Sequence, residues 1–179
     1  MAVQLARFGE SDFDQLITWI SSEDLMTNWS GSLFKFPLTK DSLSWYIQDS
    51  NESASPEVYI YKVLDAESGK CIGHISLGGI SKKNNCARIT RVLIGDADAK
   101  GKGYCADMIR EILRIGFEEL NLHRISLGVY DTNDPAIKCY ERAGMVREGI
   151  QRDVLYHEGK YWSILEMSML KHEWKMNKD

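Results

Sequence analysis

The amino-acid sequence predicts an α/β (α+β) fold in which a mixed, mostly antiparallel sheet is flanked by helices. Some segments alternate apolar and polar residues as strands do, and others repeat apolar residues at three- and four-residue steps as amphipathic helices do. A strand–helix–strand unit lies in the middle of the chain. We expect the order βααβββαβαββ in a single domain over residues 1–179, because a chain of 179 residues with 44% apolar content can form one sizeable core.

The first part of the chain is predicted to contain one strand and two helices. Apolar residues fall on one helical face after Asp12, and Ser11 or Asp12 can cap that helix. A later segment has no steady period, and Pro37 prevents a regular helix from continuing through it. The predicted elements are an edge strand over 3–8, a helix over 12–22, an irregular segment over 24–38, a helix that starts at Thr39 or Asp41, and an exposed loop over 48–55.

The rest of the chain is predicted to be mostly sheet. Alternating segments are separated by short polar turns, which is typical of antiparallel pairs. Gly144 follows the last helix and is a natural helix stop. The expected strands are 58–64, 71–80, 87–95, 123–130, 145–156 and 161–170, with helices over 105–120 and 133–143.

Residues 89–120 combine a buried strand, a short loop and a glycine-rich helix start. Gly101 and Gly103 allow the backbone to approach a ligand with no side chain in the way. The first turn of a helix has unpaired N–H groups and the positive end of the helix dipole. We therefore expect an anion there, most simply a phosphate.

Composition narrows the choice of partners and of compartment. A net charge of −4 gives no reason to expect nucleic acid. No opening signal segment and no stretch of membrane-spanning length is visible, so we expect a cytoplasmic protein that does not bind membranes. The four cysteines form no C-x-x-C pair, and we interpret them as reduced, partly buried thiols: Cys71, Cys86, Cys105 and Cys139.

The glycine-rich turn is a weak signal by itself, because glycines can also simply ease a tight strand-to-helix turn. It lacks the Lys-Ser/Thr ending of a P-loop and does not match the dinucleotide fingerprint. Its significance rises with a second motif one strand later, which runs from Asn133 through Ala136 and Tyr140 to Gly144 and Met145.

Together the two motifs resemble those of the GNAT superfamily of N-acetyltransferases, in particular its ribosomal-protein and polyamine branches. Residues 100–105, Lys-Gly-Lys-Gly-Tyr-Cys, resemble the family's Gln/Arg-x-x-Gly-x-Gly/Ala loop, and residues 133–145 resemble its second coenzyme motif. Three residues depart from the family pattern: Lys100 replaces Gln or Arg, Cys105 replaces Gly or Ala, and Met145 replaces Phe. The resemblance implies a GNAT-like sheet over nearly the whole chain.

The resemblance implies acetyl-CoA as the cosubstrate, without a metal. Backbone groups of residues 92–94 would pair with the pantetheine arm, amides of residues 101–105 would cradle the pyrophosphate, and Asn133 would bond near the pantetheine. The coenzyme-binding residues expected in this way are Val92, Leu93, Ile94, Lys100, Gly101, Lys102, Gly103, Tyr104, Cys105, Asn133 and Ala136.

The implied reaction is direct attack of an amine on the thioester. It needs a proton for the leaving thiolate, and Tyr140 is the expected general acid because a phenol has a pKa of about 10. The alternative for Tyr140 is a packing role. Many family members carry a glutamate on the central strand as base, but this strand offers Arg88, Thr90 and Arg91. His74, Glu23, Asp24 or a water chain stays open as the base.

The acceptor is the least defined part of the prediction. Trp29 and Phe34 are expected to line its pocket, although such aromatics can equally fill the core. The acceptor is expected to be a small amine or a protein N-terminus, and the C-terminal edge strands are compatible with a homodimer. The alternatives are a non-catalytic acyl-CoA-binding sensor of the same fold and a nucleotide-binding α/β domain.

Overall fold

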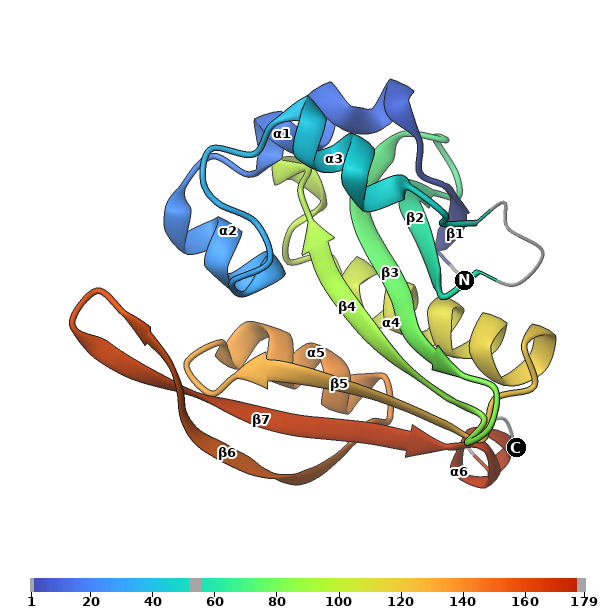
Figure 1. The fold of residues 1–179 in the computed structure, drawn as a ribbon. Coiled ribbons are helices and arrows are strands. Elements are labelled where there is room, and N and C mark those ends of the chain that lie inside the picture. The colour runs from blue at the N-terminus through green and yellow to red at the C-terminus, as the bar shows by residue number, and fades with distance from the viewer. Residues whose placement is uncertain (1, 52–55, 177–179) are drawn as a thin grey trace.

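One seven-stranded sheet in the order β1-β2-β3-β4-β5-β7-β6 forms the centre of the computed structural model, which describes residues 2–51 and 56–176 (Figure 1). Neighbouring strands are antiparallel except β4 and β5, which are parallel. The mixed, mostly antiparallel sheet and the edge position of the first strand are therefore confirmed. The strands are β1 (Val3–Arg7), β2 (Val58–Asp65), β3 (Cys71–Ser81), β4 (Cys86–Ile94), β5 (Arg124–Tyr130), β6 (Val146–His157) and β7 (Lys160–Leu170).

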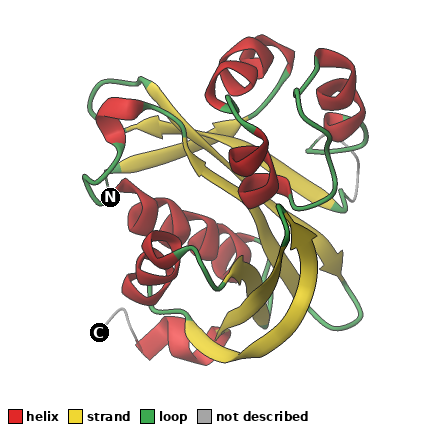
Figure 2. Ribbon diagram, turned by 90° about the vertical axis from the view of Figure 1, so that its left-hand side faces the viewer, coloured by secondary structure: helices red, strands yellow, loops and turns green. Residues whose placement is uncertain are grey.

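Helices cover both faces of this twisted sheet (Figure 2). The α-helices are α1 (Phe13–Trp19), α2 (Glu23–Ser30), α3 (Lys40–Ile47), α4 (Tyr104–Arg114), α5 (Asp134–Arg142) and α6 (Lys171–Met176). Two short 3₁₀ turns, η1 (Glu10–Asp12) and η2 (Ala97–Ala99), and a π-helical turn, η3 (Ile115–Glu119), accompany them. The predicted loop over 48–55 lies partly outside the described residues.

Helices α2 and α6 were not predicted. The structure places α2 within the segment that the sequence marked as irregular. The Ser22 hydroxyl caps α2 by accepting the Leu25 N–H at 3.2 Å, and Gly31 ends it at φ 60°. Only eight residues form this helix, and its buried residues are Met26, Thr27 and Trp29. One of these buried residues, Thr27, is polar, so no regular apolar period marks the helix in the sequence.

The two faces of the sheet bury separate clusters. On one face α4 contributes Met108, Ile109, Ile112 and Leu113, each 0% exposed. Burying each such side chain is worth roughly 1.5–3 kcal/mol, so this helix is a major source of stability. On the other face, helices α1 to α3 and the chain between them pack onto the sheet and contact Leu93 of β4. Strand β4 is thus held from both sides.

Strands β4 and β5 pair only at their first residues and then diverge (Figure 1). The paired residues are Cys86 to Arg88 with Arg124 to Ser126. Beyond them β4 still pairs with β3 as far as Ile94, and β5 still pairs with β7 as far as Tyr130. The later half of β4 therefore has no strand on its β5 side, and its peptide groups there are open to a ligand.

A β-bulge distorts β4 at this point. Its register with β3 shifts between the pairs His74↔Leu93 and Ser76↔Thr90, and Arg91 has φ 54°. A non-glycine residue at positive φ costs of order 1 kcal/mol, and such residues collect at functional sites. Two side chains hold the bulge by donating to the Arg91 carbonyl: the Trp29 indole N–H at 3.0 Å and His74 Nδ1 at 3.0 Å.

The prediction that all four cysteines are reduced is wrong for two of them. Cys105 in the first turn of α4 and Cys139 in α5 form a disulfide, with Cα atoms 6.0 Å apart, while Cys71 and Cys86 are free. The two disulfide cysteines are 34 residues apart, so their spacing alone did not show that α4 and α5 pack together. The argument for a cytoplasmic location from reduced thiols is lost. Within the described ranges, no helix has both the length and the apolar character needed to span a membrane.

Candidate active site

A cavity of about 660 Å³ lies where β4 and β5 diverge. Its walls come from α2, β4, the loop before α4, β5 and α5. This is a usual size for a ligand site, and a gap between diverging strands is a usual place for one. The predicted coenzyme residues that line it are Val92, Leu93, Ile94, Lys100, Gly101, Gly103, Tyr104, Cys105, Asn133 and Ala136.

The start of α4 forms one end of the cavity. Gly103 is the N-cap with φ 90°, Gly101 has φ 77°, and no side chain caps the helix. A Cβ added to either glycine would meet no heavy atom within 4 Å, so the space in front of these amides is open. Uncapped N–H groups at the positive end of a helix dipole suit an anion.

Neighbours of these glycines divide between the cavity and the solvent. The Tyr104 side chain turns away and its hydroxyl donates to Asp65, a hydrogen bond that is the main cause of the fall of the Asp65 pKa to about 2. Only the backbone of Tyr104 is therefore available to an anion. Lys102 is exposed and does not line the cavity, whereas Lys100 does.

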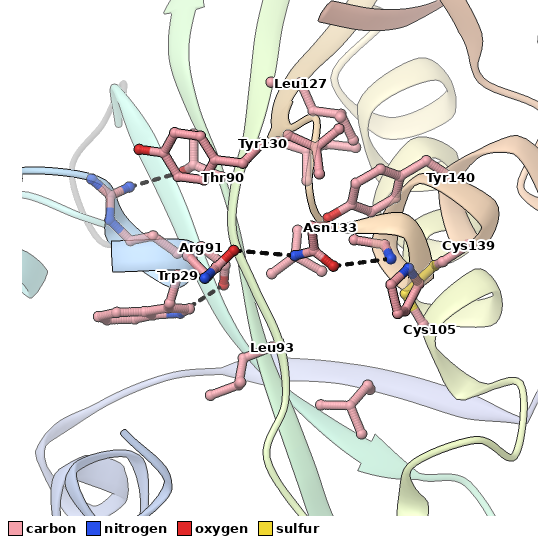
Figure 3. A pocket seen from close by; sticks show the side chains of 18 of the residues that line it. Trp29, Thr90, Arg91, Leu93, Cys105, Leu127, Tyr130, Asn133, Cys139 and Tyr140 are labelled. Atoms are coloured by element: carbon pink, nitrogen blue, oxygen red, sulfur yellow. Dashed lines mark hydrogen bonds between the residues drawn. A yellow bond between two sulfur atoms is a disulfide. The ribbon is translucent and has the colours of Figure 1, made fainter. Parts of the chain in front are cut away.

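Helix α5 lies next to the start of α4, to which the Cys105–Cys139 disulfide joins it, and forms another wall of the cavity. The Asn133 carboxamide oxygen accepts the Ala136 N–H at 3.3 Å, which caps the helix. Its amide nitrogen donates across the cavity to Asn28 Oδ1 at 3.5 Å (Figure 3). A contact this long is weak, so the Asn133 N–H₂ group can turn to a ligand at little cost.

Tyr140 lines the same cavity from α5 and is 6% exposed. Burial raises the pKa of Tyr140 far above its ordinary value, because the phenolate would lose its hydration. The phenol therefore keeps its proton at neutral pH. In Figure 3, Tyr140 and Asn133 lie on one side of β4, and Trp29 and Arg91 lie on the other.

His74 does not line this cavity. It is 1% exposed, and its ring contacts the aromatic rings of Phe8, Trp29 and Tyr46. Burial lowers its pKa to about 4, so the ring is neutral at pH 7. Its Nδ1–H is the donor to the Arg91 carbonyl, whereas Nε2 has no partner among the described residues. His74 supports the bulge from the β3 side, and its ring does not lie in the cavity that Tyr140 lines.

The two aromatic residues predicted for the acceptor pocket separate. Trp29 lines the cavity, while Phe34 does not and stacks on Trp29 with ring centroids 5.5 Å apart. Beside Phe34, Trp45 and Tyr46 line a neighbouring cavity of about 550 Å³. The irregular early segment and α3 thus build the side of β4 that faces away from Tyr140.

Sequence reasoning missed some lining residues. Asn28 and Tyr130 line the cavity, and Asn28 makes the contact with Asn133. No motif marked Asn28, because α2 itself was not recognised. Tyr130 ends a predicted strand, and that position was the only signal that could have identified it.

One cluster outside the cavity bears on the expected absence of a metal. Potential ligand atoms of Asp24, His157 and Glu158 lie within 4.8 Å of one another, and His157 Nε2 is 2.7 Å from Asp24 Oδ1. Asp24 and Glu158 are exposed, and exposed acidic groups are common without an ion. The metal-free prediction stays a prediction.

Comparisons with known proteins agree with this geometry. A family profile described as acetyltransferase (GNAT) domain matches residues 3–146. A putative ribosomal N-acetyltransferase from Bacillus subtilis (strain 168) is 32% identical over 110 residues, which are 62% of this chain and 59% of that protein. Spermidine N(1)-acetyltransferase from Vibrio cholerae serotype O1 is 33% identical over 75 residues, 42% of this chain and 43% of that protein. The chain thus spans about half of the length of each of these relatives.

The fold is also shared with solved structures. The crystal structure of spermidine N-acetyltransferase from Vibrio cholerae in complex with CoA and spermine has a TM-score of 0.82, at 24% identity over 97% of this chain and 98% of that chain. This likeness confirms the predicted sheet and its helices. The profile covers most of the sequence, and both motifs that carried the resemblance contribute residues to one cavity. The chain belongs to the GNAT acetyltransferase family.

Proposed function

We propose that the protein is an acetyl-CoA-dependent N-acetyltransferase, built as one domain over residues 1–179, that acetylates a primary amine by direct attack. One observation carries the proposal. A single cavity joins the unpaired edge of β4, the uncapped glycine-rich start of α4 and the phenol of Tyr140. Membership of the GNAT family and relatives that are named N-acetyltransferases support it.

The chain's own groups fit the coenzyme. Residues 92–94 line the cavity and have no strand on their β5 side, although β3 pairs with them on the other side. Their peptide groups that point to the open side would pair with the amides of the pantetheine arm. Amides of residues 101–105 would cradle the pyrophosphate, with Lys100 adding a positive charge at the cavity wall. Asn133 would donate its amide N–H₂ to the coenzyme, and Ala136 would form an apolar wall.

Tyr140 acts as general acid in this proposal. The amine nitrogen attacks the thioester carbon, the C–S bond breaks, and the Tyr140 hydroxyl gives its proton to the leaving sulfur. Its raised pKa keeps the proton in place until charge develops on the sulfur. The amine loses a proton to water in the cavity. His74 is not retained as base, because it does not line the cavity, its pKa of about 4 makes it a weak base, and its Nδ1–H already donates to the Arg91 carbonyl.

Thiol release from acetyl-CoA with a panel of amines tests the proposal. The panel includes polyamines, amino sugars, amino acids and short peptides, because the proposal leaves both a small amine and a protein N-terminus open as acceptors. Amine-dependent release of CoA thiol is the expected result. Binding of acetyl-CoA without release for any amine would instead favour a non-catalytic acyl-CoA-binding sensor. Protection by ATP but not by CoA in a thermal-shift assay would favour a nucleotide-binding domain.

We further propose a homodimer formed through the C-terminal edge of the sheet and a cytoplasmic location. Strand β6 is an edge strand, and Val146 and Ile150 are 52% and 59% exposed on it. Long exposed edge strands pair readily with another chain, which supports the dimer. Light scattering of the purified protein tests the dimer, and fractionation of the source cells tests the location.

A further inference from the structure

The second cavity opens beside the first and shares part of its wall. Residues of both β4 and α3 line its volume of about 550 Å³. Arg88, Thr90 and Arg91 of β4 line this cavity and the first one alike. The two cavities therefore adjoin at the bulge of β4, and a group bound in the second lies next to the wall of the first.

Arg91 at this junction carries a charge that no carboxylate of the described residues matches. Within residues 2–51 and 56–176, no acidic oxygen lies within 4.0 Å of its guanidinium, and its only side-chain hydrogen bond is from Nη1 to Thr90 Oγ1 at 2.8 Å. Its Cζ lies 4.8 Å from the centroid of the Tyr46 ring. Arg88 differs, because it is bound by both oxygens of Glu166 at 2.9 and 3.0 Å.

Two buried polar atoms beside the cavity also lack partners. Arg91 Nε and the Tyr46 hydroxyl have no partner of good hydrogen-bond geometry among the described residues, although Ser76 and the Arg91 guanidinium are polar neighbours of that hydroxyl and lower its pKa. Tyr46 is only 7% exposed. Leaving a buried donor unpaired costs about 1–3 kcal/mol, so such groups point to a ligand that completes them. Burial raises the pKa of Tyr46 to about 12, which keeps it a donor at neutral pH.

We propose that Arg91 and Tyr46 recognise a carboxylate on the acceptor, so that the substrate is an amine that carries a carboxylate close to its nitrogen. The guanidinium offers N–H donors and the phenol offers an O–H donor, and both kinds of donor match an anion. The positive charge of the guanidinium also repels a cation. The proposal rests on the proposed acetyltransferase function and defines its substrate class. Two sources share this chemistry: a free amino acid and a peptide that begins with an acidic residue.

Acidic residues of the second cavity do not cancel this charge. Asp49 and Glu57 line it, but both are exposed, so water screens them. Arg91 is partly buried and stands at the junction itself. A polycation bound in the second cavity would place a positive group near Arg91, which is unfavourable.

The acceptor test compares molecules that differ only in the anion. The series contains an α-amino acid, its carboxamide and its decarboxylated amine, each for several side chains, together with spermidine. A second arm compares peptides that begin with Asp with the same peptides that begin with Asn. Rates are expressed per concentration of neutral amine, because removing the carboxylate changes the amine pKa. We expect kcat/KM to be about 10- to 100-fold higher for the carboxylate-bearing member.

Variants of Arg91 test whether this residue causes the preference for a carboxylate-bearing amine. Arg91→Met should remove the advantage of the carboxylate, while Arg91→Lys should retain part of it, mainly through a higher KM. Tyr46→Phe should lower the advantage by a smaller factor. Arg7→Met is the matched control, because Arg7 is exposed on edge strand β1 and lines neither cavity. Coenzyme affinity and thermal unfolding of each variant show that it is folded.

The outcomes separate this inference from the proposed function. The inference is overturned if thiol release is faster with spermidine, the carboxamides or the decarboxylated amines than with the amino acids, and if Arg91→Met shows the same preference. The proposed acetyltransferase function would then still stand. If no amine reacts although acetyl-CoA binds, calorimetry with the N-acetylated amino acid and its carboxamide decides. Tighter binding of the carboxylate in wild type but not in Arg91→Met supports the recognition site, and equal binding overturns it.

Discussion

At the scale of single residues, burial sets the protonation of two side chains that the sequence could only nominate. Tyr140 and His74 are both almost fully buried, and burial favours the neutral form of each. For Tyr140 the neutral form is the acid that holds a proton. For His74 it is a ring that cannot be charged at pH 7 without cost.

Tyr140→Phe should therefore separate chemistry from binding. The ring still fills its place on α5, so coenzyme affinity should stay within a few-fold of wild type, while turnover falls by about 10² or more because the proton donor is gone. Steady-state kinetics with calorimetry of CoA binding checks this. An equal loss in both quantities would indicate that Tyr140 only packs the helix.

His74 should make stability fall in mild acid. Its folded pKa of about 4 lies below the unfolded value near 6.5, so the unfolded chain takes up the proton first as pH falls. The contribution of neutral His74 to the free energy of unfolding is complete above pH 6.5. It is lost as pH falls towards 4, by up to about 3 kcal/mol.

Urea unfolding of wild type and His74→Gln at pH 7 and pH 4.5 measures this contribution. The free energy of unfolding should fall more over this range in wild type than in the variant. Identical pH dependence in the two proteins would show that His74 titrates normally.

At the scale of elements, the glycine-rich start of α4 should serve the coenzyme rather than only the turn. Gly103 and Gly159 both have positive φ, 90° and 78°, and an added Cβ at either meets no heavy atom within 4 Å. Gly103→Ala and Gly159→Ala should thus lose similar stability, about 1–2 kcal/mol.

Only Gly103→Ala should also lose CoA affinity, by about tenfold, because the new methyl group would enter the open space where the pyrophosphate is proposed to bind. Gly159 lies in the turn between β6 and β7, away from the cavity, and so controls for strain. Unchanged CoA affinity in Gly103→Ala would contradict the placement of the pyrophosphate.

At the scale of the whole molecule, the Cys105–Cys139 disulfide joins the two helices that wall the cavity. A cross-link over 34 residues removes conformational entropy from the unfolded chain worth about 4 kcal/mol by the loop-closure relation.

The double variant Cys105→Ser/Cys139→Ser should lose stability of that order, and reduction of wild type with dithiothreitol should have the same effect. Urea unfolding with and without reductant measures it. Cys71→Ser/Cys86→Ser is the control, since both thiols are free. A reductant that leaves the unfolding curve of wild type unchanged would argue against the cross-link.

The sequence by itself determined most of the sheet and nominated most of the residues that line the cavity beside the start of α4. Strand alternation depends on local burial, and the motif at residues 100–105 depends on glycine's access to positive φ, which Gly101 and Gly103 both adopt. Both signals are local, so they can be recognised without knowing the fold.

Only the tertiary structure decided the remaining features, because these features depend on contacts between segments that are distant in the sequence. The Arg91 carbonyl meets Trp29 and His74 only after the N-terminal helices pack onto the sheet, and Cys105 meets Cys139 only once α4 and α5 are neighbours. Helix α2 buries the polar Thr27 beside Met26 and Trp29, so no regular apolar period marked it in the sequence. The unpaired charge of Arg91 beside the buried Tyr46 hydroxyl is likewise a property of packing, which no local pattern encodes.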